Sequence, residues 1–336
     1  MRLLKYTVKR LLFLAPVMLG VLVVTFIVAR ILPADPIYLL VPADADKITV
    51  DAVRRELGLD KPVYAQFIGY LKGVVRGDLG TSIHTGNPVT ADIRHRFPAT
   101  LELTLLGLAL CVFVSIPLGV FAAVRRDGLV DHVARIVSLV GVSLPSFWLA
   151  LLLVYLLFFK LGWAPPPLGR GPVGFSPPTI TGMYSVDTLL AGDWQGFLVV
   201  LRYLALPVIS LALINMAPLT RLTRSSMIEA LGSEYVRFAL AAGIPKRTIY
   251  FRLALKNALL PPITLLGIIV GFLLGGAVII ETIFAWPGLG LWAVNAAMQS
   301  DYAPVQAFAL LAAGVKVIVY LLTDLVYFAI DPRIRY

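Results

Sequence analysis

Few side chains in this sequence could carry out chemistry, and those few are scattered. The histidines, His84, His95 and His132, lie in two loops and form no H-E-x-x-H pattern, so no metal triad or Ser/His/Asp constellation can be assigned. Cys111 is the single cysteine, which excludes an internal disulfide, a Cys-based metal site and a redox pair. No G-x-x-x-x-G-K-[ST] run, which would cradle the phosphates of ATP, is present. The sequence therefore predicts a protein that is not an enzyme and binds neither a metal nor a cofactor itself.

The most informative polar stretch is 233–262, which reads SEYVRFALAAGIPKRTIYFRLALKNALLPP and predicts two short helices joined by a tight turn. Gly243 tolerates the left-handed conformation that follows a helix, and Pro245 has the φ angle that the first turn of the next helix requires. Ser233 can cap the first helix by accepting backbone N–H groups, and the charge of Glu234 suits the positive pole of its dipole. The function of such an element depends on where it lies in the molecule.

The rest of the chain is apolar enough for a membrane protein with several spans. Hydrophobic residues make up 59% of the 336 positions and charged residues only 14%. The first apolar run, of about 20 residues, exceeds the apolar core of a signal peptide and predicts an uncleaved anchor. Six runs can cross about 30 Å of hydrocarbon. They are Leu11–Leu32, Leu101–Val124, Ile136–Leu157, Val199–Leu219, Ile263–Ile283 and Phe308–Ile330.

The distribution of charge predicts which side of the membrane each loop faces. With the N-terminus in the cytoplasm, 16 of the 29 Lys and Arg residues but only 5 acidic residues fall on the cytoplasmic side. The net charge of +10 is then positive-inside bias and indicates no nucleic-acid partner. Both termini and residues 233–262 are assigned to the cytoplasm. There the stretch would dock a soluble partner or lie on the inner leaflet as an amphipathic helix pair, and its attachment to spans at both ends argues against DNA binding.

Three segments are assigned to the external side. Residues 33–100 form the longest, with helices expected at Val50–Leu57 and Val63–Val75. Residues 162–197 are rich in Pro and Gly and cannot form long regular elements, and residues 286–305 open with a P-G-L-G turn.

Charged residues in or near the spans are candidates for a substrate pathway. Arg202 and Glu281 lie near external span ends, where snorkelling to the interface is the commoner explanation. Lys316 and Asp324, eight residues apart, share roughly one face of the last span and could form a structural pair between helices or contact substrate. The glycines of the fifth span, at close to four-residue spacing, predict close helix packing rather than a pore lining; they are Gly267, Gly271, Gly275 and Gly276.

Residues 233–262 match a known pattern. Glu234, Tyr235, Ala239, Ala241 and Gly243 form E-Y-x-x-x-A-x-A-x-G. This resembles the cytoplasmic EAA loop of ABC-transporter permeases and is most similar to the dipeptide/oligopeptide/nickel subfamily. Further matches follow in order along nearly the whole chain. They include LPADP at 32–36, RELGLDKPVYAQF at 55–67, GDLGTS at 77–82, ETIFAWPGLG at 281–290 and the ending YFAIDPRIRY.

Two departures from the general permease pattern favour the peptide-type subfamily. Arg237 stands where the general pattern has a Glu, and the acid lies about one turn earlier at Glu234. Leu255 and Lys256 replace a final Leu-Pro, and the proline comes only at Pro261.

The resemblance implies an all-α integral membrane protein with the type I ABC importer permease fold, six spans and cytoplasmic termini. It implies an N-terminal span with an external, periplasmic subdomain (1–96), a five-helix core (97–330) and a short cytoplasmic tail (331–336). The core contains the coupling loop, 220–262. Such a chain is a multi-pass protein of the cytoplasmic (inner) membrane of a prokaryote.

The resemblance also implies partners and a mechanism. The partners are a second homologous permease, two cytoplasmic ATPase subunits that bind ATP and Mg, an external solute-binding protein, a peptide substrate and membrane lipid. The first helix of the coupling loop would sit in an ATPase groove and act as a lever for alternating access. The implied coupling residues are Glu234, Tyr235, Arg237, Phe238, Ala239, Ala241, Gly243, Asn257 and Pro261. Candidates for an external gate or binding-protein contact, for which plain turn chemistry is an equal alternative, are Gly77, Asp78, Gly80 and Ser82.

Two alternatives stay open at this point. Glutathione and nickel chelates are carried by permeases that resemble the peptide type, because the external binding protein does most of the selecting. A secondary transporter driven by an ion gradient would also lack an ATP-binding motif, but the EAA-like loop favours the importer.

Overall fold

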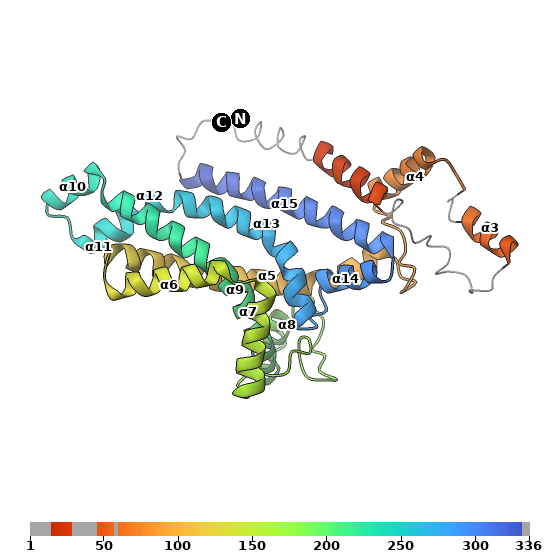
Figure 1. Ribbon diagram of the computed structural model, residues 1–336, viewed down its shortest axis with the longest axis horizontal. Coiled ribbons are helices and arrows are strands. Elements are labelled where there is room, and N and C mark those ends of the chain that lie inside the picture. The colour runs from red at the N-terminus through yellow and green to blue at the C-terminus, as the bar shows by residue number, and fades with distance from the viewer. Residues whose placement is uncertain (1–14, 29–45, 57–59, 331–336) are drawn as a thin grey trace. The chain divides into compact units, whose positions relative to one another are not determined.

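A computed structural model describes residues 15–28, 46–56 and 60–330, and the regular structure in these ranges is helical apart from one antiparallel bridge between Thr81 and Pro88 (Figure 1). The chain divides into two compact units, Met1–Thr100 with Pro287–Val317, and Leu101–Trp286 with Ile318–Tyr336. The helices in chain order are Ala15–Val28, α3 (Lys47–Glu56), α4 (Val63–Val75), α5 (Val89–Val124), α6 (Leu129–Ser143), α7 (Ser146–Leu153), the π-helix η1 (Val154–Lys160), α8 (Tyr184–Leu190), α9 (Trp194–Leu231), α10 (Glu234–Ala241), α11 (Lys246–Thr248), the π-helix η2 (Ile249–Ala254), α12 (Leu255–Ala258), α13 (Leu260–Ile283), α14 (Leu289–Met298) and α15 (Tyr302–Ile330).

Three of the described helices are long and apolar enough to cross a membrane: α5, α9 and residues Tyr302–Leu325 of α15. The helical stretches Lys246–Ala258 and Leu260–Leu273 meet at 52° and make a fourth if they form one broken span. The chain is therefore an all-α, multi-pass membrane protein, as the composition predicted.

The predicted span Ile136–Leu157 is not one straight helix. It divides between α6, which ends at Ser143, and α7, which starts at Ser146. Leu144 has an extended backbone with ψ of 132°, because the ring of Pro145 excludes the helical conformation from the residue before it. The predicted span Leu11–Leu32 lies partly outside the described residues, which show a helix from Ala15 to Val28.

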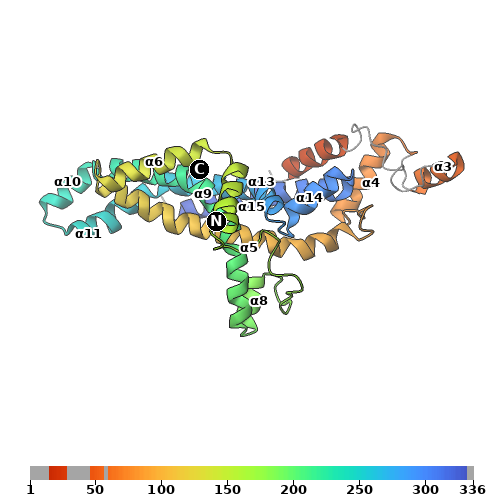
Figure 2. The same ribbon diagram turned by 60° about the horizontal axis from the view of Figure 1, so that its bottom comes forward.

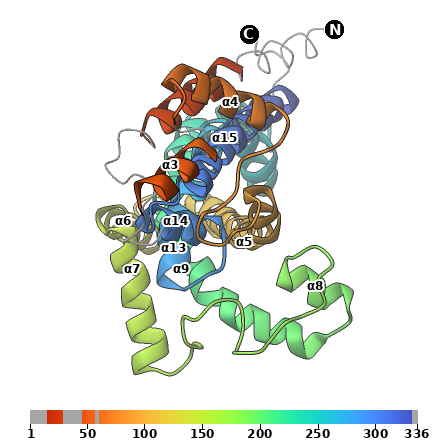
Figure 3. The ribbon, with the colours of Figure 1, turned by 90° about the vertical axis from the view of Figure 1, so that its right-hand side faces the viewer.

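The first unit is held by aromatic contacts and a small apolar core. Phe26 packs edge-on against Phe67 of α4 at 5.2 Å between ring centroids and stacks with Tyr70 at 6.1 Å, so that the N-terminal helix and α4 lie side by side (Figure 3). A second cluster joins the start of α5 to α14 and α15. Its buried members are Val89, Leu289, Trp292 and Ala307.

The segments assigned to the external side follow the predicted pattern with one addition. The helix expected at Val63–Val75 has those bounds, whereas α3 starts at Lys47, earlier than expected, because the carboxylate of Asp46 accepts the Thr49 N–H at 2.9 Å. Between Gly162 and α9 the only helix is the short α8. The segment after Trp286 contains α14, which its opening turn did not predict.

The second unit is built around α9. Helices α6, α7, α8 and α13 all pack against it. Figures 1 and 2 show α10 and α11 at the far end of α9 from α8. α5 approaches α9 closely at Gly119, where a Cβ atom would lie 2.7 Å from Cβ of Thr223 and 2.9 Å from the carbonyl oxygen of Thr220. At Gly267 of α13 a Cβ atom would likewise lie 2.5 Å from Oγ1 of Thr323, which confirms close packing at that glycine.

This contact gives a test of the α5–α9 packing. We expect Gly119→Ala to lower stability by about 1–3 kcal/mol, because the added methyl group would meet backbone as well as side-chain atoms. Thermal unfolding of the detergent-purified chain measures the effect. Gly69→Ala in α4 is the matched control, since a Cβ there meets nothing within 4 Å and alanine favours a helix. Equal midpoints for Gly119→Ala and the wild type would show that the helices are not in close contact.

Candidate functional site

The C-terminal end of α9 leads directly into the predicted helix pair. With 38 residues α9 is about 57 Å long, whereas the hydrocarbon core is about 30 Å thick. At least one end must therefore extend beyond the bilayer, and the C-terminal turns, with Arg221, Arg224 and Glu229, are the polar ones. Only Gly232 and Ser233 separate α9 from α10.

The two helices and the left-handed turn between them are confirmed. α10 ends at Ala241, and Gly243 has φ of +73°. The Gly243 N–H donates to the Leu240 carbonyl and the Ile244 N–H to the Ala239 carbonyl, both at 3.1 Å, which closes the end of the helix. The second half then runs from Lys246 through η2 to Ala258.

The predicted side-chain cap at Ser233 is wrong. Ser233 precedes α10, but its hydroxyl donates to the Ala230 carbonyl at 2.5 Å rather than accepting an N–H of α10. The shortness of the link to α9 explains this, because the last carbonyls of α9 lie within reach of the hydroxyl. Glu234 is at the N-terminal end of α10 as predicted and pairs with Arg237 at 2.8 Å on the exposed surface.

One face of α10 is buried against the second unit. Val236 and Ala239 are 1% and 3% exposed and belong to an apolar cluster that also includes residues of α5, α9, η2 and α12. The other members are Val120, Ala123, Met227, Ile249, Ala254 and Ala258. Ala239, one of the predicted coupling residues, therefore packs α10 against the second unit and does not lie on the exposed face of the helix.

The opposite face of α10 is open and combines charge with large apolar groups. Phe238 is 76% exposed, Leu240 is 47% exposed and Tyr235 is 39% exposed. The paired side chains of Glu234 and Arg237 lie beside them. Exposed aromatic side chains next to charges are typical of surfaces that contact another protein. Among the other predicted residues, Ala241, Gly243, Asn257 and Pro261 are also exposed.

A buried ion pair ties α6 to α9 near this end. Arg224 donates through Nε and through Nη2 to the carboxylate of Asp131, the second bond being 2.7 Å long. The side chain of Asp131 is fully buried, and it also accepts the Asp127 N–H at 3.0 Å and faces Arg135 at 3.6 Å. The Arg224 hydrogen bonds lower the pKa of Asp131 to about 2 despite its burial. In the sequence, Asp131 and Arg224 only contributed to the uneven distribution of charge, and no local pattern predicted that they would form an ion pair.

A second buried ion pair holds the Pro- and Gly-rich segment. Arg170 donates to Glu102 of α5 at 2.5 Å and to the Gly182 carbonyl at 2.9 Å, and its guanidinium lies 3.6 Å from the ring centroid of Tyr184. Glu102 also accepts the Ser185 N–H at 2.6 Å. The segment is therefore fixed by specific polar contacts, although its composition predicted only the absence of long elements.

The pathway candidates differ in their surroundings. Arg202 is exposed, as snorkelling requires, but Glu281 is completely buried, so the snorkelling interpretation is wrong for Glu281. α13 continues past Glu281 to Ile283, so this residue lies within the helix and not beyond its end. Lys316 is exposed and Asp324 is half-buried.

The candidate residues of the loop predicted to be external, at 77–82, form an ordered turn in the first unit. Gly77 and Gly80 have φ of +81° and +85°, and the Asp78 carboxylate accepts the Gly80 N–H at 2.9 Å. Ser82 is 3% exposed and donates to Asp301 at 2.6 Å. Ser82 thus anchors the loop instead of facing outward. Over the described residues, no group of three or more His, Cys, Asp or Glu could hold a metal ion.

The described helices thus form a membrane-embedded unit with an exposed helix pair after the end of α9. Residues 115–336 match the family described as "binding-protein-dependent transport system inner membrane component", and residues 3–104 match the family described as the N-terminal part of that membrane component. The chain belongs to this family of inner-membrane permeases.

Relatives match over almost their whole length. The chain is 44% identical over 319 residues to the probable D,D-dipeptide transport system permease protein DdpB of Escherichia coli K12, covering 95% of this chain and 94% of that one. It is 39% identical to the di/tripeptide transport system permease protein DppB of Pseudomonas aeruginosa, with 99% of each chain covered. It is 36% identical to the glutathione transport system permease protein GsiC of Pectobacterium atrosepticum, again with 99% of each covered.

The Asp131–Arg224 ion pair can be tested by its effect on the stability of the folded chain. We expect Asp131→Asn to lower stability by about 3 kcal/mol, because it leaves a largely buried guanidinium without its counter-charge. Adding Arg224→Gln should cost less than the two separate effects combined, and thermal unfolding in detergent measures all three variants. Glu234→Gln, which removes an exposed ion pair, is the control and should change the midpoint little. Additive losses would contradict the pairing.

The same pair predicts a pH dependence. The folded-state pKa of Asp131, about 2, lies below its ordinary value of 3.8, so its contribution to stability is present above pH 3.8 and is lost as the pH falls through about 2. The difference in unfolding midpoint between wild type and Asp131→Asn should therefore shrink over that acid range. A difference that stayed constant down to pH 2 would contradict the lowered pKa.

Proposed function

We propose that this chain is the membrane subunit through which an ATP-driven, binding-protein-dependent importer moves peptides across the cytoplasmic membrane by alternating access. The observation that carries the proposal is the exposed outer face of α10, fixed from beneath to a transport-family membrane unit. The sequence has no nucleotide-binding motif, so energy from ATP has to enter through such a contact.

The proposed assembly follows the division of labour that the resemblance to ABC-transporter permeases implies. A solute-binding protein delivers substrate from outside, and two ATPase subunits bind ATP and Mg on the cytoplasmic side. A second homologous permease completes the pathway, and the subunits are surrounded by membrane lipid. This chain would contribute six spans with both termini in the cytoplasm, in the type I importer fold.

The proposed domain organisation is the one expected from the sequence. Residues 1–96 supply the first span and an external subdomain, 97–330 supply the permease core, and 331–336 form a cytoplasmic tail. The coupling loop, 220–262, includes the polar end of α9 as well as the helix pair.

The proposed lever has a short mechanical path. Phe238 and Tyr235 would contact an ATPase groove, while Val236 and Ala239 hold α10 against α5, α9 and η2. A displacement of α10 is then passed to α9, which packs against α6, α7, α8 and α13. This is a proposal from spatial continuity, and it requires that the bundle has two arrangements that the ATPase state can select.

The proposed substrate is a di- or oligopeptide, because most of the named relatives carry peptides. Glutathione is the second candidate, since a relative with almost equal similarity is named for it and since glutathione is itself a short peptide. A nickel chelate has no comparable support. An ion-gradient-driven transporter is not favoured, because the family is named for its dependence on a binding protein.

Reconstitution tests the proposed function. Proteoliposomes that contain this permease, its partner permease and the ATPase subunits should accumulate a labelled dipeptide only when ATP and the binding protein are supplied. Uptake that persisted without the ATPase subunits, driven by an ion gradient, would contradict it.

The lever predicts a specific defect in Gly243→Val. At φ of +73° a β-branched residue is strained, although a Cβ would meet no atom within 4 Å. We expect the strain to change the angle between α10 and α11, so that the complex assembles and hydrolyses ATP while peptide uptake falls at least tenfold. Wild-type uptake by this variant would contradict the lever.

Gly192→Val is the matched control. Gly192 has φ of +70°, and a Cβ there also meets nothing within 4 Å, but this residue lies between α8 and α9, away from the helix pair. It should suffer similar backbone strain and keep its uptake. An equal loss in both variants would mean that strain alone, rather than the position of the turn, causes the defect.

A further inference from the structure

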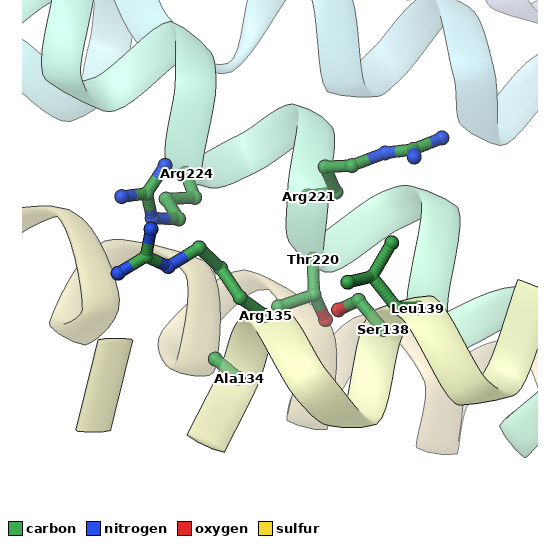
Figure 4. Close-up of a pocket in the computed structure, with 7 residues that line it drawn as sticks. All are labelled: Ala134, Arg135, Ser138, Leu139, Thr220, Arg221 and Arg224. Atoms are coloured by element: carbon green, nitrogen blue, oxygen red, sulfur yellow. The ribbon is translucent and has the colours of Figure 1, made fainter. Parts of the chain in front are cut away.

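A cavity of about 200 Å³ lies between α6 and α9, beside the buried ion pair (Figure 4). Ala134, Arg135, Ser138 and Leu139 of α6 line one side of it, and Thr220, Arg221 and Arg224 of α9 line the other. The surface of the cavity is therefore mostly apolar, and two hydroxyl-bearing residues and three arginines contribute to its lining. Neither the fold nor the proposed lever uses this combination.

The charges around the cavity leave a positive excess. The fully buried carboxylate of Asp131 neutralises Arg224. Arg135 is 3.6 Å from Asp131 and 3.9 Å from the exposed Asp127. Arg221 has no carboxylate within 4.0 Å in the part of the chain that the structure describes. Figure 4 shows Arg135 and Arg224 together on one side of the cavity and Arg221 extending on the other.

Two residues with hydroxyl groups are largely buried, and the structure shows no hydrogen bond of either hydroxyl to the described residues. Ser138 is 6% exposed and Thr220 is 3% exposed, and both line the cavity. A hydroxyl on a packed helix usually pairs with the carbonyl one turn earlier, as Thr223 does with Leu219 at 2.8 Å. Two free donors near guanidinium groups suit an acceptor that enters from outside, such as a phosphate oxygen.

The adjoining surface of α6 indicates what carries the phosphate. Val133, Ile136 and Leu139 are 51%, 61% and 61% exposed and follow one another at three-residue spacing along one side of the helix. Leu139 also lines the cavity, so this aliphatic row is continuous with the cavity wall. A basic pocket continuous with an aliphatic surface fits a phosphodiester headgroup with its acyl chains better than it fits a free phosphate.

We propose that this cavity binds the headgroup of an anionic phospholipid, with Arg221 and Arg135 on the phosphate, the hydroxyls of Ser138 and Thr220 as donors, and an acyl chain along Val133, Ile136 and Leu139. The lipid would join α6 to α9 where Asp131 and Arg224 already do so, next to the helix pair. The proposal does not depend on which substrate is transported or on how ATP is coupled.

Native mass spectrometry of the full-length chain in detergent tests this site. Phosphatidylglycerol with oleoyl chains should remain bound, whereas phosphatidylcholine with the same chains should dissociate. Arg221→Gln should weaken phosphatidylglycerol binding by roughly fivefold, because it removes one guanidinium from the headgroup. Ser138→Ala with Thr220→Val should also weaken binding, without any change of charge.

Arg247→Gln is the matched control, because it removes an exposed positive charge from α11 outside the cavity, and it should bind phosphatidylglycerol like wild type. Equal weakening by Arg247→Gln and Arg221→Gln would show diffuse attraction and overturn the site. Displacement of the lipid by glycerol 3-phosphate at equal concentration would assign the cavity to a free phosphate instead. Unchanged binding in both cavity variants, with a partner permease covering this face in the assembled complex, would assign it to a subunit interface.

Discussion

Every backbone N–H and C=O group that enters a bilayer must find its partner inside the protein, and this constraint underlies the whole structure. It makes α5, α9 and α15 long and continuous, although the backbone breaks at Leu144 within the apolar run that α6 and α7 share. The length of α9 then has a mechanical consequence. A helix of about 57 Å extends well past about 30 Å of hydrocarbon, so one rigid element runs from the membrane to the base of α10.

The two buried ion pairs lie near the ends of the apolar run of α5. Glu102 and Val124 are about 33 Å apart along α5, close to the thickness of the hydrocarbon core. Glu102 binds Arg170 at one end of this run, and Asp131 binds Arg224 just beyond the other. Burying such pairs is costly, and they do not by themselves stabilise a fold relative to apolar packing. Their benefit is specificity, because each permits one arrangement of the segments that it joins.

Much of this architecture could be predicted from local sequence patterns. The turn at Gly243 and the bounds of α4 could be predicted because they depend on the conformational preferences of residues adjacent in the sequence. The long apolar helices followed from hydropathy and length. These are properties that a short window of sequence contains.

The features that could not be predicted depend on residues far apart in the chain. Asp131 meets Arg224 across 93 positions, and Ser82 meets Asp301 across 219, with no spacing rule to connect them. Glu281 looked like an interfacial charge because hydropathy alone does not tell which face of α13 is covered. The division of α10 into a buried face with Ala239 and an open face with Phe238 also needed the packing against α5 and η2. A single sequence therefore does not show which face of a helix remains exposed after folding.

The central claim is that the open face of α10 is where a cytoplasmic ATPase engages this chain. Its most direct test is site-specific cross-linking in the assembled transporter, with Cys111→Ala as background and a single cysteine placed at Phe238 or at Ala239. The account predicts that a short bifunctional reagent joins the cysteine at position 238 to the ATPase subunit, that ATP changes the yield, and that the cysteine at the buried position 239 reacts little. Absence of an ATPase adduct at 238 in an active complex, or equal reaction at both positions, would contradict it.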